Sequence, residues 1–104
     1  MRKTIIIFVS IVLATLSATS LASGNSEAGQ AKSATCMGCH GLAGNSTMPN
    51  FPKLAGQGEG YILKQLQEFK SGVRENAIMA GVASLLLEQD MMDIAAYYSI
   101  QTIS

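Results

Sequence analysis

The sequence predicts a small all-α domain whose helices are separated by long loops, and three observations lead to this fold class. Its 104 residues leave room for one small domain and no second core. Apolar residues recur with helical periodicity, whereas the strict alternation of a strand is scarce. The segment 41–60 holds five glycines and two prolines, which favours a loop with at most a short helical turn.

The N-terminal segment is predicted to be an export signal. Arg2 and Lys3 precede the run 5–16, which contains no charged residue and is followed by a Ser- and Ala-rich stretch. A basic start, a short apolar run and small residues are typical of a secretory signal peptide. The alternative is a permanent membrane anchor, but the apolar run is shorter than the roughly 20 residues that a spanning helix needs.

Small residues locate the expected cleavage point. Ser20 and Ala22 lie three positions and one position before it, so residues 1–22 form the predicted signal and residues 23–104 the mature domain. The mature part carries five basic and seven acidic residues, a net charge of −2. Because the chain has no basic stripe to neutralise phosphates, nucleic acid is not an expected partner. A core this small gives only marginal stability, so a further stabiliser is expected.

The first helix is expected to begin at Asn25 or Ser26 and to run toward Thr35. Asn and Ser are favoured N-cap residues, and Glu27 in the first turn complements the positive end of the helix dipole. The loop 41–60 follows.

Two further helices are predicted, which makes three main helices in all. The middle one spans 60–71 and stops at Gly72, and its apolar stripe consists of Ile62, Leu63, Leu66 and Phe69. The segment 73–84 is expected to be irregular. The last helix spans 88–101, with Glu88 and Asp90 near its positive end and with Ile94, Tyr97, Tyr98 and Ile100 available for burial.

The chemistry of the chain lies at Cys36, Cys39 and His40. Two cysteines separated by two residues and followed at once by histidine form the attachment pattern for c-type haem. One helical turn presents both thiols to the two vinyl groups of the porphyrin, and the next imidazole reaches the iron. One covalently bound haem c is therefore the expected cofactor, and it supplies the missing stabiliser.

Three other interpretations of this motif are weaker. A disulfide between Cys36 and Cys39 would close a very small loop and leave His40 without a role. Thiol exchange of the thioredoxin kind expects a βαβ context. A structural zinc ion takes four ligands, and the chain holds only these three Cys and His residues.

A methionine is expected as the second axial ligand, because His40 is the one histidine of the chain. Of six methionines, four are excluded: Met1 leaves with the signal, Met37 lies inside the attachment turn, and Met91 and Met92 lie early in the last helix. Met48 is only eight residues past His40, whereas Met79 is far enough away to reach the opposite haem face. Met79 is therefore favoured over Met48.

The order of several segments resembles class I cytochromes c. It is most similar to the small bacterial periplasmic branch, often called c-553-type and related to each half of the two-haem c-4 type. The resemblance covers essentially all of the predicted mature chain, and the segments that carry it are 28–32, 36–41, 51–57, 65–72 and 93–98.

The resemblance implies a cytochrome c-like domain wrapped around one haem, and it assigns five site residues. Cys36 and Cys39 would form thioethers, His40 would be the proximal ligand and Met79 the distal ligand of the iron. The Pro52 carbonyl would accept a hydrogen bond from the His40 ring, which would fix that ring.

The resemblance also bears on two helix contacts. Gly29 would let the first helix cross the last one closely near Tyr97. The family often caps the last helix with Ser or Thr, but this chain has Leu87 there, so the cap is expected to be missing or shifted to Ser84.

The function expected from this ligation is one-electron transfer in the periplasm, without catalysis. An iron held by His40 and Met79 has no open position for a substrate, and the partners would be a donor and an acceptor redox protein that dock transiently. Lys53 and Lys64 are candidates for the exposed haem edge, with ordinary solvated charge an equally good interpretation. The alternatives are a haem-based gas-binding protein and, if the N-terminal segment is retained, a membrane-tethered subunit of a larger oxidoreductase.

Overall fold

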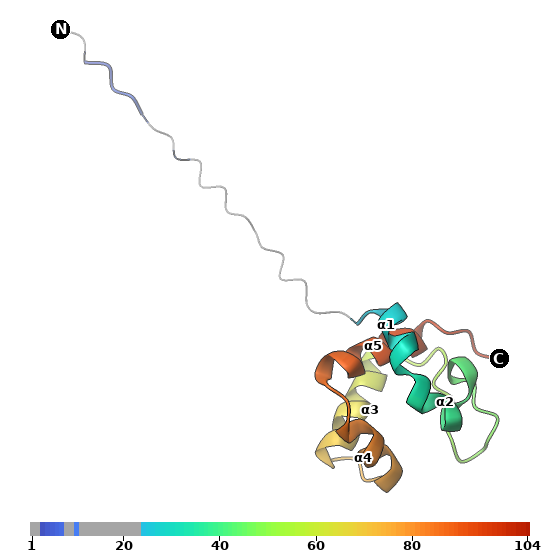
Figure 1. The fold of residues 1–104 in the computed structure, drawn as a ribbon. Coiled ribbons are helices and arrows are strands. Elements are labelled where there is room, and N and C mark those ends of the chain that lie inside the picture. The colour runs from blue at the N-terminus through green and yellow to red at the C-terminus, as the bar shows by residue number, and fades with distance from the viewer. Residues whose placement is uncertain (1–2, 8–9, 11–23) are drawn as a thin grey trace.

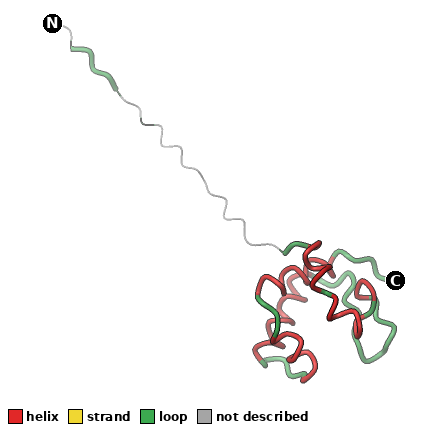
Figure 2. Tube along the Cα trace, viewed as in Figure 1, coloured by secondary structure: helices red, strands yellow, loops and turns green. Residues whose placement is uncertain are grey.

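A computed structural model describes residues 3–7, 10 and 24–104 of the chain (Figure 1). Within these residues all regular structure is helical and there is no strand (Figure 2). The predicted all-α class is therefore confirmed. In chain order the elements are α1 (Ser26–Lys32), α2 (Ala34–His40), the 3-10 turn η1 (Leu42–Gly44), α3 (Glu59–Ser71), α4 (Ala77–Ser84) and α5 (Glu88–Ser99).

The predicted first helix is two helices joined at Ser33. Ser33 ends α1 and precedes α2, and its hydroxyl donates to the Gln30 carbonyl over 2.8 Å. A serine that bonds back to the preceding turn competes with the helical ladder and bends the chain. The expected end near Thr35 is therefore wrong, because the helical path continues to His40.

The segment 73–84, which was expected to be irregular, contains the helix α4. The Asn76 side chain caps this helix by accepting a hydrogen bond from the backbone N–H of Met79 over 3.0 Å. Asn is a strong N-cap residue, and the capped turn holds Met79 inside the first turn of α4. The prediction of an irregular segment was wrong from Ala77 onward.

The start of α5 is capped from inside the helix. Leu87 occupies the N-cap position and has no side-chain acceptor, but its backbone N–H donates to the Asp90 carboxylate over 2.8 Å. This is the reciprocal half of a capping box. The expected shift of the cap to Ser84 is wrong, since that hydroxyl donates to Gly81 within α4.

The core lies around α5, which packs against both α1 and α3 (Figure 1). Helix α4 packs on α3, and α2 packs on α1 and η1. The buried cluster joins side chains from α2, α3 and α5: Cys36, Ile62, Leu66, Met91, Ile94, Ala95 and Tyr98. The two ends of the chain are thus brought together at α1 and α5.

The contact between α1 and α5 is as close as the resemblance implies. A Cβ atom built on Gly29 would lie 1.9 Å from the backbone oxygen of Asp93 and 2.8 Å from the Cβ of Tyr97. Only a residue without a side chain fits there. Gly24 meets α5 in the same way, because its Cβ would lie 2.0 Å from the backbone oxygen of Met92.

The loop between η1 and α3 is held by backbone bonds and by the C-terminal tail. The Gly44 carbonyl accepts from the N–H groups of Leu54 and Ala55, over 2.8 and 3.2 Å. The Asn45 side chain donates to Thr102 and accepts from Ser104, each over 2.9 Å. These bonds hold the end of the loop beside η1 and its start beside the C-terminal tail.

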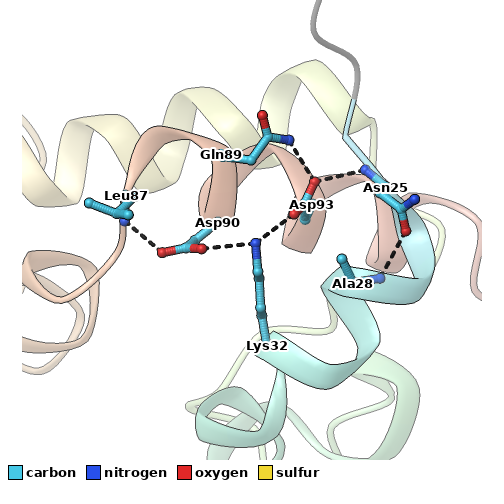
Figure 3. A network of polar contacts seen from close by, with 7 residues as sticks. All are labelled: Asn25, Ala28, Lys32, Leu87, Gln89, Asp90 and Asp93. Carbon is cyan, nitrogen blue, oxygen red and sulfur yellow. Dashed lines mark hydrogen bonds and ion pairs between the residues drawn. The ribbon is translucent and has the colours of Figure 1, made fainter.

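A polar network centred on Asp93 ties α1 to α5 (Figure 3). The buried Asp93 carboxylate accepts from the Asn25 backbone N–H over 2.8 Å, from Lys32 over 2.6 Å and from Gln89 over 2.8 Å. Lys32 also lies 2.9 Å from Asp90. A buried carboxylate with this many donors is stabilised in its charged form.

This network predicts a loss of stability in acid. The Asn25 N–H, followed by Lys32, lowers the pKa of Asp93 from 3.8 to about 2. A carboxyl group whose pKa is lower in the folded state stabilises the fold above its unfolded pKa, and this contribution is lost as the pH falls toward its folded pKa. The free energy of unfolding should therefore decline between pH 4 and pH 2, and we expect Asp93→Asn to remove the part of this decline that Asp93 causes. Denaturant unfolding of both proteins across this range measures it.

Asp90→Asn is the matched control for the acid prediction. Asp90 shares Lys32 with Asp93, but its side chain is 23% exposed against 4% for Asp93. Asp90→Asn should therefore change the acid-dependent decline in the free energy of unfolding less than Asp93→Asn does. An Asp93→Asn protein that keeps the full wild-type decline would show that Asp93 does not carry the effect.

Of the predicted signal, residues 1–22, only residues 3–7 and 10 are among the described residues, so the signal and its cleavage point lie largely outside them. Among the helices of the described residues, none has the length and apolar character needed to cross a membrane.

Candidate functional site

Helix α2 brings the three motif residues to one helical segment. Cys36 and His40 are buried, Cys39 is half-buried, and both cysteines are free thiols among the described residues. No disulfide is therefore formed by this pair. Burial raises the pKa of the Cys36 thiol. Cysteines used for thiol exchange have lowered pKa values, so the environment of Cys36 argues against that chemistry.

The ring of His40 is held by the loop that follows it. Its Nδ1 atom lies 2.7 Å from the Pro52 carbonyl oxygen, the contact that the family resemblance implies. A backbone carbonyl is an acceptor only, so Nδ1 carries the proton and donates. In a neutral ring held in this way, the lone pair lies on Nε2, which is the arrangement that a metal ligand needs.

The two candidate methionines lie on different elements. Met48 belongs to the same loop as Pro52 and lines a surface pocket with Phe51 and Pro52. Met79 is part of α4 and packs against the buried core cluster. Met48 thus lies in the loop that contacts His40 through Pro52, and Met79 lies on a separate helix.

The excluded methionines occupy other surroundings. Met37 is exposed on the outside of the attachment turn, and Met91 is a core residue that is 2% exposed. Met91 therefore packs in the core.

An apolar groove lies between the start of α2 and helix α4. Thr35, the neighbour of Cys36, lines it together with Ile78, the neighbour of Met79, and the other lining residues are Lys32, Gly81, Val82, Leu85, Leu86 and Asp90. Cys36 and Met79 themselves are not among the residues that line this groove.

The two lysines considered for the haem edge have protein neighbours. Lys53 donates to the Ser104 backbone oxygen over 2.6 Å, and the Lys64 ammonium lies 3.8 Å from the Glu68 carboxylate. These contacts are those of ordinary surface charges.

A metal site made of protein ligands alone does not form. The described residues, which include every Cys and His of the chain, contain no cluster of three or more His, Cys, Asp and Glu side chains that could hold a metal ion.

The residues do fit a covalently held haem. Two free thiols at the right spacing precede a buried imidazole whose Nδ1 is held by the Pro52 carbonyl. The buried Tyr98 hydroxyl lacks a hydrogen-bond partner among the described residues, which is unusual in a complete core. Tyr98 shares the buried cluster with Cys36, and sequence reasoning did not assign it to the site. The available sequence signal was a tyrosine at a core position of a helix, because its hydroxyl group would be buried there and would need a hydrogen-bond partner.

Comparison with known proteins identifies the family. Residues 26–99 match the model of the cytochrome c family. Cytochrome c4 of Pseudomonas aeruginosa is 53% identical over 95 residues, which cover 89% of this chain and 47% of that protein. Cytochrome c-554(548) of Halomonas halodenitrificans is 38% identical over 81 residues, which cover 75% of this chain and 98% of that protein.

Solved structures give the same result. The crystal structure of reduced recombinant cytochrome c4 from Pseudomonas stutzeri matches with a TM-score of 0.75 and 52% identity, over 79% of this chain and 48% of that one. The chain spans about half the length of the cytochrome c4 proteins that it matches. The family implies a c-type haem with iron, which agrees with the free cysteines of α2. The chain therefore belongs to the cytochrome c family.

Proposed function

We propose that this chain is an exported one-electron carrier with a single haem c, attached through Cys36 and Cys39 and ligated by His40 and Met79. The observation that carries the proposal is the 2.7 Å contact between Nδ1 of His40 and the Pro52 carbonyl, directly after the two free thiols. A ring oriented in this way keeps its other nitrogen for the iron. When bound, the haem supplies the one-electron redox couple.

The position of Met79 supports its role as the second ligand. Met48 shares the loop of Pro52, which His40 already contacts, whereas Met79 lies on the separate helix α4 and packs against the core cluster that contains Cys36. Two protein ligands leave no open position for a substrate. The proposed role is therefore electron transfer, and catalysis is not part of it.

The N-terminal pattern supports a periplasmic location with the signal removed. The partners would be redox proteins, a donor and an acceptor, that bind through small transient interfaces. A retained N-terminal segment would instead tie the domain to a membrane.

Spectroscopy of the purified holoprotein tests the proposed function. We expect haem to stay with the protein in acidified organic solvent, because thioethers hold it. The ferric form should be low-spin with the weak red sulfur-to-iron band, and the ferrous form should bind carbon monoxide slowly or not at all.

The opposite spectrum would contradict the electron-carrier proposal. A high-spin ferric protein whose ferrous form takes up carbon monoxide rapidly has an open iron position. That result would favour the gas-binding alternative.

A further inference from the structure

The Asn45 side chain joins the loop that carries Pro52 to the segment 101–104, which follows α5. Its Nδ2 atom donates to the Thr102 carbonyl and its Oδ1 atom accepts from the Ser104 N–H, each over 2.9 Å. A side-chain amide that donates and accepts in this way pairs with the backbone as another peptide group would. Both bonds are long-range, because the partners lie 57 and 59 residues further along the chain.

The same segment also contacts the loop on the other side of Pro52. Lys53 donates to the Ser104 backbone oxygen over 2.6 Å. A Cβ atom built on Gly56 would lie 3.0 Å from Cγ1 of Ile103, so the two chain segments pass closely there. The Gly56 N–H also donates to a carbonyl in the last turn of α5 over 2.9 Å. Contacts before and after Pro52 therefore hold the loop to the end of α5 and to the segment 101–104.

The position of Pro52 is important because its carbonyl orients the ring of His40, whose Nδ1 atom lies 2.7 Å from that oxygen. Proline has no backbone N–H, so Pro52 cannot fix its own position by donating to a neighbour. The stretch 45–52 also contains no helix or strand that would hold it. The place of the carbonyl therefore depends on the contacts that anchor the loop on either side.

We propose that Asn45 is a positioning residue for His40, because its two bonds to the segment 101–104 fix the loop whose Pro52 carbonyl holds the His40 ring. The inference rests on the proposed function, in which His40 is a ligand of the haem iron. An acceptor on the second ring nitrogen fixes the orientation of a ligating histidine and raises its basicity. Asn45 thus acts on the iron ligand through the loop and without touching the ring.

The Asn45→Ala holoprotein tests this role, because alanine removes both hydrogen bonds and changes no charge. We expect the Nδ1 proton of His40, followed by proton NMR of the ferrous protein, to exchange with solvent at least about fivefold faster, the low end for two neutral hydrogen bonds. We also expect the midpoint potential to rise, because a less basic imidazole stabilises ferric iron less.

Asn50→Ala is the matched control, since Asn50 is an exposed asparagine of the same loop. Its replacement should leave the exchange rate of the His40 proton and the midpoint potential unchanged. An Asn45→Ala protein that behaves like Asn50→Ala would overturn the inference. The inference would also fail if the core amide protons of Asn45→Ala exchanged faster by the same factor as the His40 proton, because Asn45 would then only stabilise the fold as a whole.

A second pair of variants tests the same contact from the segment 101–104, and it can be used even if Asn45→Ala does not fold. Ser104→Pro removes the N–H that donates to Asn45, whereas Ser104→Ala keeps it. Ser104→Pro should shift the exchange rate and the potential in the same direction as Asn45→Ala but by less, and Ser104→Ala should be neutral. Equal values for the two Ser104 variants would contradict the inference.

A double-mutant cycle shows whether Asn45 and Ser104 act through one contact. In the Asn45→Ala background, Ser104→Pro should cause no further change in the exchange of the His40 proton. Fully additive effects would mean that Ser104 acts on His40 by another route, and the inference would be wrong.

The failure of this inference and the failure of the proposed function are distinguishable. Wild-type protein without covalent haem would remove the proposed function itself. Covalent, low-spin haem in the wild type together with an unchanged His40 ring proton in Asn45→Ala would remove only the role of Asn45.

Discussion

Replacing Met79 with Ala should open the sixth position of the haem iron, and this is the largest spectroscopic change that we expect. The weak red sulfur-to-iron band should disappear, and the ferrous protein should gain rapid binding of carbon monoxide. The midpoint potential should fall by a substantial part of the roughly 0.8 V range over which axial ligands set haem potentials. Absorption spectroscopy and a redox titration measure these changes.

The structure makes Met79→Ala a clean substitution. The Asn76 side chain caps α4 through the backbone N–H of residue 79, which alanine retains. Alanine is also the best helix former, so α4 should persist. Loss of the band would therefore result from removal of the Met79 side chain and not from unfolding of α4.

Met48→Ala is the matched control, since it removes the other candidate sulfur. Met48 is 50% exposed in the loop next to Pro52, and we expect its replacement to leave the band and the potential unchanged. A band that is lost in Met48→Ala and kept in Met79→Ala would reverse the ligand assignment. The electron-transfer role would survive that result.

The sequence predicts the attachment motif well because its geometry is local. Cys36, Cys39 and His40 lie within five consecutive residues, so one helical turn defines their spacing. The contact between His40 and the Pro52 carbonyl is different. A carbonyl acceptor is present at every residue, so only the family resemblance pointed to this one.

The helix α4 was missed because its sequence signals are weak. It has only eight residues and contains Gly81. Asn76 followed by the apolar helix formers of 77–80 was the available signal. Short helices of this kind depend on tertiary packing, here against α3, more than on propensity.

The network around Asp93 could not be predicted from charge alone. Lys32 and Asp93 are 61 residues apart, and their pairing depends on the crossing of α1 and α5. The resemblance identified Gly29 at this crossing but not Gly24, which approaches α5 just as closely. Gly24 lies next to the predicted cleavage point, where a structural role was not considered.

Replacing Gly29 with Ala should cause the largest loss of stability among the substitutions considered. The new Cβ would lie 1.9 Å from the Asp93 backbone oxygen and 2.5 Å from the carbon of that carbonyl, so α1 must move away from α5. Overpacking typically costs 1–3 kcal/mol, and a clash with backbone belongs at about 3 kcal/mol or above. In a domain of this size, that corresponds to a decrease in Tm of roughly 12 to 24 °C.

Gly60→Ala is the control for this substitution. Gly60 is also a helical glycine, in the first turn of α3, but a Cβ atom there meets nothing within 4 Å. Its replacement should be neutral or should stabilise the protein by up to about 1 kcal/mol, because alanine has the higher helix propensity. Comparison of Gly29→Ala with Gly60→Ala thus separates the effect of adding a methyl group to a helix from the effect of the steric clash where α1 crosses α5.

The position of the clash also predicts that shortening the Tyr97 side chain will not restore the stability lost in Gly29→Ala. Tyr97 contributes a Cβ atom at 2.8 Å, but the nearest atoms belong to the Asp93 backbone, which no side-chain substitution removes. The Tyr97→Ala substitution should therefore fail to rescue Gly29→Ala in thermal denaturation of the holoprotein. Recovery of most of the lost Tm in the double variant, or a loss below about 1 kcal/mol in Gly29→Ala alone, would mean that α1 and α5 can separate at little cost.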